Sequence, residues 1–188
     1  MVIERNKYLQ ELVDCRHNGL VKIITGMRRC GKSFLLFRLF RRFLEDNGVA
    51  DDHIVEMAFD DYAFKEFRNP DKFYAYVKGK ITDDQPYYIL LDEVQMLNEF
   101  EDVLNGLLHI PNADVYVTGS NAKFLSKDII TEFRGRGYQI HVAPLSFAEF
   151  MSVYEGDRED GWNEYLLYGG LPPVVLLKTD EEKVKLLD

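Results

Sequence analysis

The stretch that decides the fold is GMRRCGKS, residues 26–33. It follows the short apolar run LVKIIT, residues 20–25, and precedes a long segment rich in leucine and phenylalanine. The letters match the phosphate-loop pattern G-x-x-x-x-G-K-[ST], in which glycines let successive backbone amides surround phosphate oxygens. The pattern is meaningful when a strand precedes it and a helix follows, as here. We therefore predict a polyphosphate-binding turn between the first strand and the first long helix.

Each residue type in this turn has a chemical reason to be there. Lys32 can reach the β- and γ-phosphates of a nucleotide, and Ser33 can offer its hydroxyl to Mg²⁺. Arg28 and Arg29 either hold phosphate or a nearby carboxylate, or are solvated. Cys30 is a filler residue or, beside a cation and a helix N-terminus, a thiolate. The expected nucleotide-binding set is Gly26, Met27, Arg28, Arg29, Cys30, Gly31, Lys32, Ser33 and Phe34.

Two adjacent acids, Asp92 and Glu93, follow the apolar run at residues 87–91. An acid at the end of a buried strand can hold Mg²⁺, so Asp92 joins Ser33 as an expected metal-binding residue. Glu93 is suited to orient the water that attacks the terminal phosphate, although it could also cap a helix or face solvent. Asp60 and Asp61 are weaker candidates, because a charged turn explains them equally well.

The nucleotide is expected to be ATP, because the Asn-Lys-x-Asp pattern that usually reads guanine is absent. A small-molecule kinase is a weaker interpretation, since no acceptor pocket is evident. Arg5 and Tyr8 precede the first strand and could border the adenine.

Polar residues also follow the fourth apolar run. Thr118, Ser120 and Asn121 end that run, where a neutral side chain can sense the γ-phosphate, and Ser120 or Asn121 is preferred for this role. The other interpretation is a turn with a helix cap. Arg134 and Arg136 precede the fifth run; an arginine there can stabilise transition-state charge, also in a neighbouring subunit, or can be solvated. The expected catalytic residues are Glu93, Lys32, Asn121 and Arg136.

Five apolar runs alternate with helical patterns, which predicts an α/β fold with a mainly parallel, five-stranded sheet and helices on both faces. The runs occupy residues 20–25, 53–59, 87–91, 115–118 and 138–142. Ligands bind at the carboxyl ends of such strands, where the glycine loop and the acids fall. The first long helix is expected over residues 32–45. Its polar stripe, Arg38, Arg41, Arg42 and Glu45, is a solvated face or, alternatively, a contact for nucleic acid or an acidic partner.

Composition is that of an ordinary globular chain of 188 residues with a net charge of -9, which disfavours nucleic-acid binding over the whole surface. Only 2 cysteines are present, and no apolar run is long enough to span a bilayer. The start of the chain lacks the apolar core of a secretory signal, so a cytoplasmic location is expected.

The motifs ITGMRRCGKS, YYILLDEVQ, TGSNAKFLS, FRGRG and APLSFAEF occur in this order within about residues 1–175. Together with YGGLP they resemble the AAA-type P-loop ATPases of bacteria and archaea whose ATPase domain precedes a C-terminal domain of unknown function. The resemblance implies a three-layer core in which the strand carrying Asp92 lies one removed from the phosphate-loop strand. It implies that Gly26, Gly31, Lys32 and Ser33 bind nucleotide, and that Asp92 handles Mg²⁺ while Glu93 activates water. Asn121 or Ser120 matches the sensor position, and Arg136 matches a "GR" of the group.

The expected division is an ATPase domain at residues 1–150 and a helical extension at residues 151–188 that leads into an absent C-terminal domain. The expected function is Mg²⁺-dependent ATP binding and hydrolysis coupled to conformational change. The alternative is a nucleotide-regulated switch or scaffold that binds DNA or protein with little turnover. A partner would bind through the absent domain, and a homo-oligomer would allow an arginine to act on a neighbouring site. No membrane association is expected.

Overall fold

The computed structural model of the chain describes residues 2–119 and 135–187. Its centre is a sheet of five strands in the order β2-β3-β4-β1-β5, and all four strand pairings are parallel. The predicted α/β class and parallel sheet are therefore confirmed. The strand β3 that ends in Asp92 is separated from β1 by β4, as the resemblance implied. The strands are β1 (Val21–Thr25), β2 (Ile54–Ala58), β3 (Tyr87–Asp92), β4 (Ala113–Thr118) and β5 (Gly137–His141).

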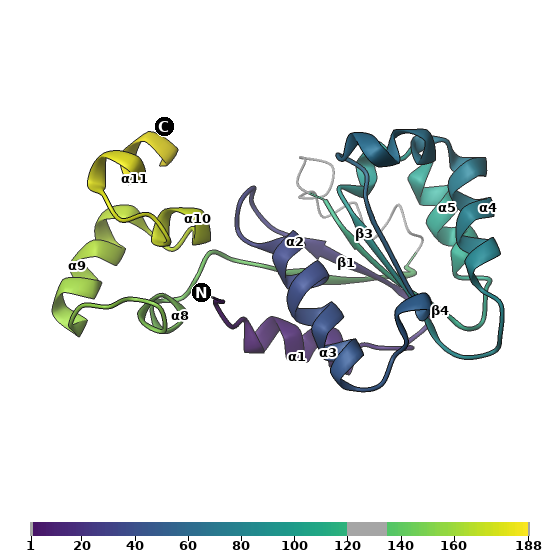
Figure 1. Cartoon of the computed structure of the whole chain (residues 1–188), viewed down its shortest axis with the longest axis horizontal. Helices are drawn as coiled ribbons and strands as arrows, with labels where there is room; N and C mark the ends of the chain where they lie inside the picture. Colours follow the sequence, from purple (N-terminus) through teal and green to yellow (C-terminus); the bar gives the residue numbers. More distant parts are fainter. Residues whose placement is uncertain (1, 120–134, 188) are drawn as a thin grey trace.

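Helices cover both faces of this sheet, which completes three layers (Figure 1). One face carries α1 (Asn6–Asp14), α2 (Lys32–Phe34) and α3 (Arg41–Asp46); the other carries α4 (Pro70–Lys80) and α5 (Phe100–Leu107). Short 3₁₀ turns lie in the connections, at Asp51–His53, Tyr62–Arg68 and Val94–Met96.

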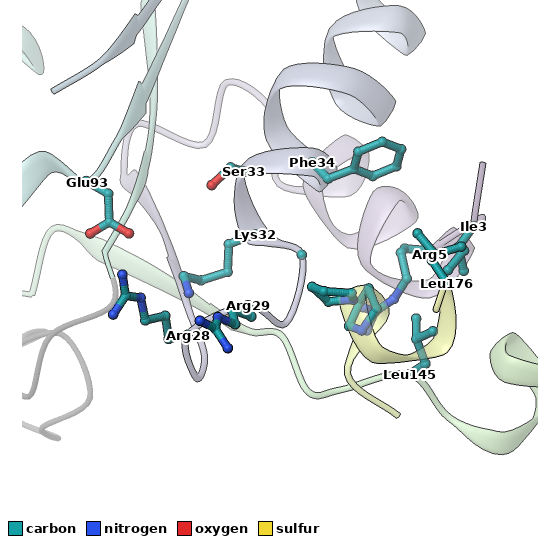
Figure 2. Close-up of a pocket in the computed structure, with 13 residues that line it drawn as sticks. Ile3, Arg5, Arg28, Arg29, Lys32, Ser33, Phe34, Glu93, Leu145 and Leu176 are labelled. Carbon is teal, nitrogen blue, oxygen red and sulfur yellow. The ribbon is translucent and has the colours of Figure 1, made fainter. Parts of the chain in front are cut away.

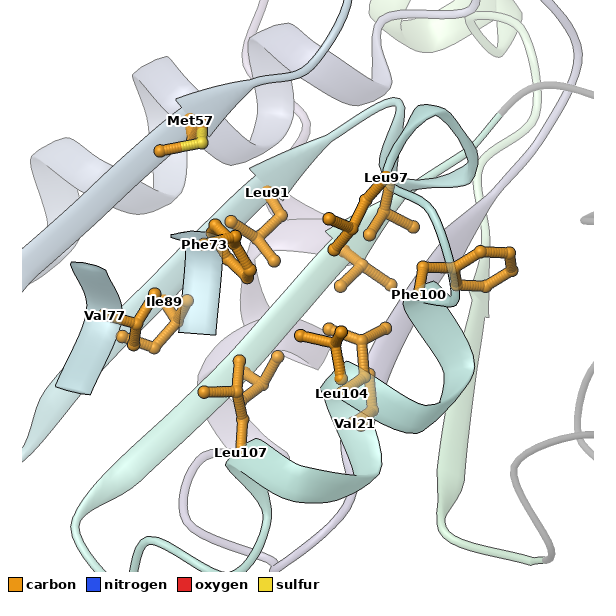
Figure 3. Close-up of a cluster of buried hydrophobic side chains, with 14 of the residues drawn as sticks. Val21, Met57, Phe73, Val77, Ile89, Leu91, Leu97, Phe100, Leu104 and Leu107 are labelled. Atoms are coloured by element: carbon orange, nitrogen blue, oxygen red, sulfur yellow. The ribbon is translucent and has the colours of Figure 1, made fainter. Parts of the chain in front are cut away.

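Side chains alternate across the sheet because successive residues of a strand point to opposite faces. In β3, Ile89 and Leu91 belong to the cluster under α4 and α5, whereas Tyr88 and Leu90 belong to the cluster under α1, α2 and α3. Figure 3 shows the first cluster, in which Phe73 of α4 and Leu104 of α5 meet the strands. Both faces are apolar, which explains why the strands read as continuous apolar runs.

The helix after the glycine loop differs from the uniform α-helix expected over residues 32–45. Six residues, Leu35–Phe40, form a π-helix η1 between α2 and α3. A π segment winds more residues into each turn, and such segments often occur near functional sites. The apolar pattern continues through the change in pitch, since Leu35, Leu36, Leu39 and Phe40 are all buried. Hydrophobic periodicity alone therefore gave no sign of it.

A buried ion pair lies on the α1 face of the sheet, where the sequence gave no warning of it. The ammonium of Lys22 on β1 donates to the carboxylate of Asp114 on β4, and the Lys22 side chain is fully buried. The hydroxyl of Tyr116 and the amide of His17 also donate to Asp114, at 2.8 and 3.1 Å. These added hydrogen bonds offset the cost of burying two charges.

The last helices form a group beside the sheet: α8 (Phe147–Met151), α9 (Arg158–Tyr168), α10 (Pro172–Val175) and α11 (Asp180–Leu187) (Figure 1). Phe147 of α8 packs against Trp162 and Tyr165 of α9, with ring centroids 4.9 and 5.5 Å apart. The expected division at residue 150 thus falls inside α8, which packs with the later helices. Gly170 lies so close to the chain leaving β5 that a Cβ on it would be 2.2 Å from the carbonyl oxygen of Leu145.

Candidate functional site

The glycine loop lies at the carboxyl end of β1, where its conformation depends on residues without side chains. Gly26 has φ of 144°, and an added Cβ would be 2.2 Å from the carbonyl oxygen of Val142 and 2.9 Å from Cys30 Sγ. Gly31 has φ of 96° and is the N-cap residue of α2. Arg29 between them also has a positive φ, 67°. Both glycines of the motif are therefore required by backbone geometry.

Lys32 spans this loop from the inside. Its ammonium donates to the carbonyl oxygens of Gly26 at 3.1 Å and Met27 at 3.0 Å, and the residue is 5% exposed. An ammonium has three donors, so one remains for another acceptor. Lys32 is thus held as a fixed positive charge at the mouth of the loop, with its position set by the loop's own backbone.

Asp92 ends β3 within reach of the loop. Its carboxylate accepts a hydrogen bond from the hydroxyl of Thr118, at the end of β4, and the Ser33 hydroxyl, at the start of α2, is near enough to favour the charged carboxylate. Burial raises the pKa of Asp92, and the Thr118 and Ser33 hydroxyls partly oppose that rise. The arrangement joins the carboxylate and hydroxyl oxygens that Mg²⁺ prefers, one from each predicted metal-binding residue.

Glu93 follows Asp92 with a left-handed backbone, φ 50°. Its amide donates to Thr118 Oγ1 at 3.2 Å, and its carboxylate accepts from the side-chain amide of Gln95. Both acids therefore contact the β4 end, Asp92 through its side chain and Glu93 through its backbone. The left-handed conformation turns the Glu93 side chain away from the course of β3, toward the glycine loop (Figure 2).

The end of the glycine loop and Glu93 line one end of a pocket of about 450 Å³, within the usual size range of small-molecule sites (Figure 2). Glu93, Arg28, Lys32 and Ser33 make this end polar, and Figure 2 shows the Arg28 guanidinium turned toward the Glu93 carboxylate. The other end is mostly apolar and is lined by Ile3, Phe34, Leu145, Pro172, Pro173 and Leu176, with Arg5 between. An elongated ligand with a charged end and an apolar end fits this division.

The two loop arginines differ in their surroundings. Arg28 faces Glu93 within the pocket, whereas Arg29 Nη1 donates to the carbonyl of Leu186 in α11 at 2.9 Å. Arg29 thereby links the glycine loop to the last helix. Cys30 is fully buried, and burial raises the pKa of its thiol despite the nearby Lys32 and Arg5 charges. A reactive thiolate is therefore disfavoured, and the interpretation of Cys30 as a packing residue fits its position.

Arg5 and Tyr8, which the sequence suggested beside an adenine, take different places. Arg5 lines the pocket and is 3% exposed. Tyr8 is not among the residues that line this pocket, and its hydroxyl accepts the amide of Ala143 at 3.1 Å.

Arg136 lies far from the pocket of its own chain. Its carbonyl accepts the amide of Val21 at 2.9 Å, at the amino end of β1 and β5. The loop follows the opposite end of β1, about 13 Å further along the strand at roughly 3.3 Å per residue. A catalytic role for Arg136 within one chain therefore conflicts with this geometry. The expected sensor residues Ser120 and Asn121, and Arg134, lie outside the described residues.

Asp61, one of the two weaker acidic candidates, and two arginines of the polar stripe also have structural partners. Asp61 caps the turn at Tyr62–Arg68 by accepting the amide of Ala63 at 2.9 Å, in line with the charged-turn interpretation. Arg41 donates to the carboxylates of Glu45, Glu56 and Asp51. Arg42 pairs with Asp46 at 3.5 Å. The stripe is therefore largely neutralised by acids of the same chain, which weakens its interpretation as a nucleic-acid contact.

Two sets of site residues escaped the sequence reasoning. Thr118 contacts both acids, whereas the sequence pattern favours Ser120 or Asn121 over Thr118 at the end of the fourth strand. The apolar wall from α10 and Leu145 was not expected at all. A hydroxyl as the last residue of a buried strand was the available signal for Thr118; Pro172 and Pro173 indicated only a rigid turn.

Sequence comparison finds two long curated relatives. A Haemophilus influenzae protein described as uncharacterized is 33% identical over 181 residues, covering 93% of this chain and 45% of its own length. A Methanocaldococcus jannaschii protein, also described as uncharacterized, is 24% identical and is covered over 38% of its length. The chain thus spans less than half the length of either relative.

Solved structures share the fold at low identity. A DNA polymerase III gamma subunit-related protein from Thermotoga maritima superimposes with a TM-score of 0.59 at 14% identity, covering 97% of this chain and 58% of that one. AMPPCP-bound DnaA from Aquifex aeolicus gives 0.57 at 16% identity, covering 96% and 59%. In the ranges 2–119 and 135–187, no helix has the length and apolarity needed to cross a bilayer.

The family model described as "AAA domain" matches residues 18–151, which include the glycine loop, the paired acids and all five strands. The match covers well over half of the chain, and the chain therefore belongs to this family of AAA-type P-loop ATPases.

Proposed function

We propose that this chain binds ATP with Mg²⁺ and hydrolyses it, and that hydrolysis drives a movement of its C-terminal helices. The observation that carries the proposal is that Lys32, Ser33 and Glu93 line one end of a pocket, with Asp92 directly before Glu93 at the end of β3. Membership of the AAA family supports nucleotide binding and hydrolysis in general. The identity of the nucleotide, the metal and the residue roles are part of the proposal.

The triphosphate is proposed to lie at the polar end. Backbone amides of the loop would hold its oxygens, and the free donor of Lys32 would bridge the β- and γ-phosphates. Ser33 and Asp92 would hold Mg²⁺, whose role when bound is to neutralise developing phosphate charge. The described residues contain no group of three or more His, Cys, Asp or Glu that could hold a metal. A site with one carboxylate, one hydroxyl and phosphate oxygens is nevertheless usual for Mg²⁺.

Glu93 is proposed to orient the attacking water and accept its proton. The Glu93 backbone is fixed by the hydrogen bond from its amide to Thr118, and Gln95 holds one carboxylate oxygen. Arg28 lies on the other side of the same pocket end and is suited to contact a phosphate there. A positioned general base of this kind contributes roughly 10²–10⁴ in rate.

The nucleoside is proposed to occupy the apolar end, between Ile3 of the N-terminal segment and Pro172 and Leu176 near α10. A ligand in that place contacts both the sheet domain and the C-terminal helices. Loss of the γ-phosphate would remove phosphate contacts from the loop that carries Arg28 and Arg29. Because Arg29 contacts α11, a shift of this loop would be passed to the last helix. This contact is the proposed route from hydrolysis to movement.

The second candidate is a switch in which ATP binding rather than turnover matters. Both candidates predict nucleotide affinity, and they differ in whether phosphate is released at a rate that depends on Glu93. The fit of Glu93 within the pocket favours the enzyme.

Titration calorimetry with ATP, ADP and GTP, each with and without Mg²⁺, tests the proposal. Tighter binding of ATP than GTP, strengthened by Mg²⁺, is expected. The Lys32→Ala variant should lose measurable ATP binding, whereas Lys72→Ala, which removes an exposed lysine paired only loosely with Glu66 at 3.5 Å, should bind as the parent does. Equal affinity of Lys32→Ala and its parent would refute the site.

A further inference from the structure

Arg5 is a buried arginine whose three guanidinium nitrogens each donate to a different segment of the chain. Its Nη1 donates to the Cys30 carbonyl at 3.1 Å, its Nη2 to the Ala143 carbonyl at 2.8 Å, and its Nε to Glu149 Oε1 at 2.9 Å. The side chain is 4% exposed. The guanidinium therefore joins the N-terminal segment, the glycine loop, the end of β5 and helix α8.

The acceptor at Cys30 gives this contact a consequence for the loop. In a trans peptide the carbonyl and the following amide hydrogen point in opposite directions within one plane. A Cys30 carbonyl turned toward Arg5 therefore turns the amide of Gly31 away from Arg5. Nη1 of Arg5 lies 3.8 Å from the position of a Cβ on Gly31, so the two residues are in close proximity. The contact fixes the direction of the last loop amide before Lys32.

Several contacts besides its own hydrogen bonds fix the position of the Arg5 guanidinium. Glu149, which balances its charge, is held by a capping box in which the carboxylate accepts from the amide and hydroxyl of Ser146. The Arg5 guanidinium also lies 4.7 Å from the centre of the Tyr8 ring, and the Tyr8 hydroxyl binds the amide of Ala143. Arg5 and Tyr8 thus bind the backbone carbonyl and the backbone amide of Ala143, respectively. Such a planar, multiply bonded guanidinium has little freedom to reorient.

We propose that Arg5 is a positioning residue for phosphate binding: by holding the Cys30 carbonyl, it keeps the Gly31 amide directed at the polyphosphate. The proposal rests on the proposed function of the loop and adds a residue 21 positions outside the motif. Arg5 acts through the loop backbone and not by direct contact with phosphate, because each of its three guanidinium nitrogens donates to a protein acceptor.

Inorganic tripolyphosphate is the probe, because it carries the phosphate chain without a nucleoside. Calorimetry is carried out on the parent, Arg5→Met and Arg5→Lys, each at a temperature where its circular dichroism melt shows a folded protein. Arg5→Met keeps an unbranched apolar stem but lacks the guanidinium and donates no hydrogen bond, and roughly tenfold or greater loss of tripolyphosphate affinity is expected. Arg5→Lys can still donate to the Cys30 carbonyl and should recover part of the loss.

Arg41→Met is the matched control. Arg41 also uses three nitrogens on three acceptors, but all of them are carboxylates outside the glycine loop. It should change thermal stability and leave tripolyphosphate affinity within twofold of the parent. This comparison separates a general loss of stability from an effect on the loop.

The outcomes are distinguishable. If the parent binds tripolyphosphate and Arg5→Met binds it equally well, the positioning role is wrong while the proposed function stands. A variant that loses ATP affinity but keeps tripolyphosphate affinity would place Arg5 at the nucleoside, which also overturns the proposal. A parent that binds neither ligand removes the proposed function and this inference together. Arg5→Met could fail to fold, and Arg5→Lys is then the test. An Arg5→Lys variant that binds tripolyphosphate as tightly as the parent overturns the positioning role of the Arg5 guanidinium. A clearly weaker affinity supports that role.

Discussion

The hydroxyl of Thr118 donates a hydrogen bond to Asp92 and at the same time accepts the amide of Glu93, at 3.2 Å. One side chain from β4 thereby fixes two neighbouring acids of β3 in different ways. Asp92 is 6% exposed and has a raised pKa because of burial, whereas Glu93 extends into the pocket. The two acids have different surroundings, as different chemical roles require.

Replacement of Asp92 with Asn should stabilise the ligand-free protein. Burial raises the pKa of Asp92 above its unfolded value, so at pH values between the two the folded state retains a proton that the unfolded state has already released. Stability from this group is full below the ordinary Asp pKa and is lost as pH rises through the raised value. At neutral pH an uncharged Asn avoids that cost, and the free energy of unfolding should rise by about 1 kcal/mol in urea titrations.

The same variant should lose Mg²⁺-dependent ATP turnover. Asp84→Asn, at an exposed turn position, is the control and should change neither property. An Asp92→Asn protein less stable than its parent at neutral pH would contradict the inferred electrostatics.

Replacement of Glu93 with Gln should preserve ATP affinity and lower turnover by roughly 10²–10⁴, because the amide cannot accept the proton of the attacking water. Binding is measured by calorimetry and turnover by phosphate release. Glu99→Gln is a close control, since Glu99 is an exposed acid that also has a left-handed backbone, φ 51°. Hydrolysis by the Glu93 variant at the parental rate would favour the switch over the enzyme.

Gly26→Ala should both destabilise the protein and impair nucleotide binding. The new Cβ would overlap the carbonyl oxygen of Val142 at 2.2 Å, and the φ of 144° disfavours any side chain. We expect a loss of about 2 kcal/mol or more in the free energy of unfolding. Gly79→Ala is its counterpart: nothing lies within 4 Å of an added Cβ in helix α4, and a gain of about 0.5–1 kcal/mol is expected.

Arg136 is proposed to act on the pocket of a neighbouring subunit, because it lies at the end of the sheet opposite its own glycine loop. Arg136→Ala and Glu93→Gln should each be nearly inactive alone. An equimolar mixture should regain activity, since a Glu93→Gln subunit can supply its arginine to an intact Glu93.

The double variant Arg136→Ala/Glu93→Gln provides the control, as it cannot supply the arginine and should restore nothing to Arg136→Ala. A mixture of the single variants that is no more active than their sum would count against action between subunits.

The sequence was sufficient for the features that depend on local pattern. Continuous apolar runs predicted the five strands to within two residues at each end, because a strand buried on both faces has no polar alternation. The order of β3, β4 and β1 came from a family resemblance and is confirmed by the pairing. Glycine spacing and the paired acids identified the polar end of the pocket for a similar reason: each is a contiguous motif.

Features that depend on contacts distant in sequence were not predictable in this way. Arg5 and Glu149 are 144 positions apart, and Lys22 and Asp114 are 92 apart. Neither pair has a local pattern that distinguishes it from solvated charges. The apolar wall from α10 likewise becomes part of the pocket only after the chain folds back from β5. The π-helix after Phe34 has an ordinary apolar periodicity, so the sequence pattern does not distinguish it from an α-helix.

One end of the pocket is formed by the glycine loop and Glu93, which follow strands β1 and β3, and a wall at Pro172, Pro173 and Leu176 belongs to the trailing helices. A molecule that occupied this pocket would contact the glycine loop and the trailing helices at the same time. Mechanical load applied to the trailing helices should therefore alter how long the molecule stays. The residence time of a bound molecule would then depend on a pulling force applied to helices outside the polar end of the site.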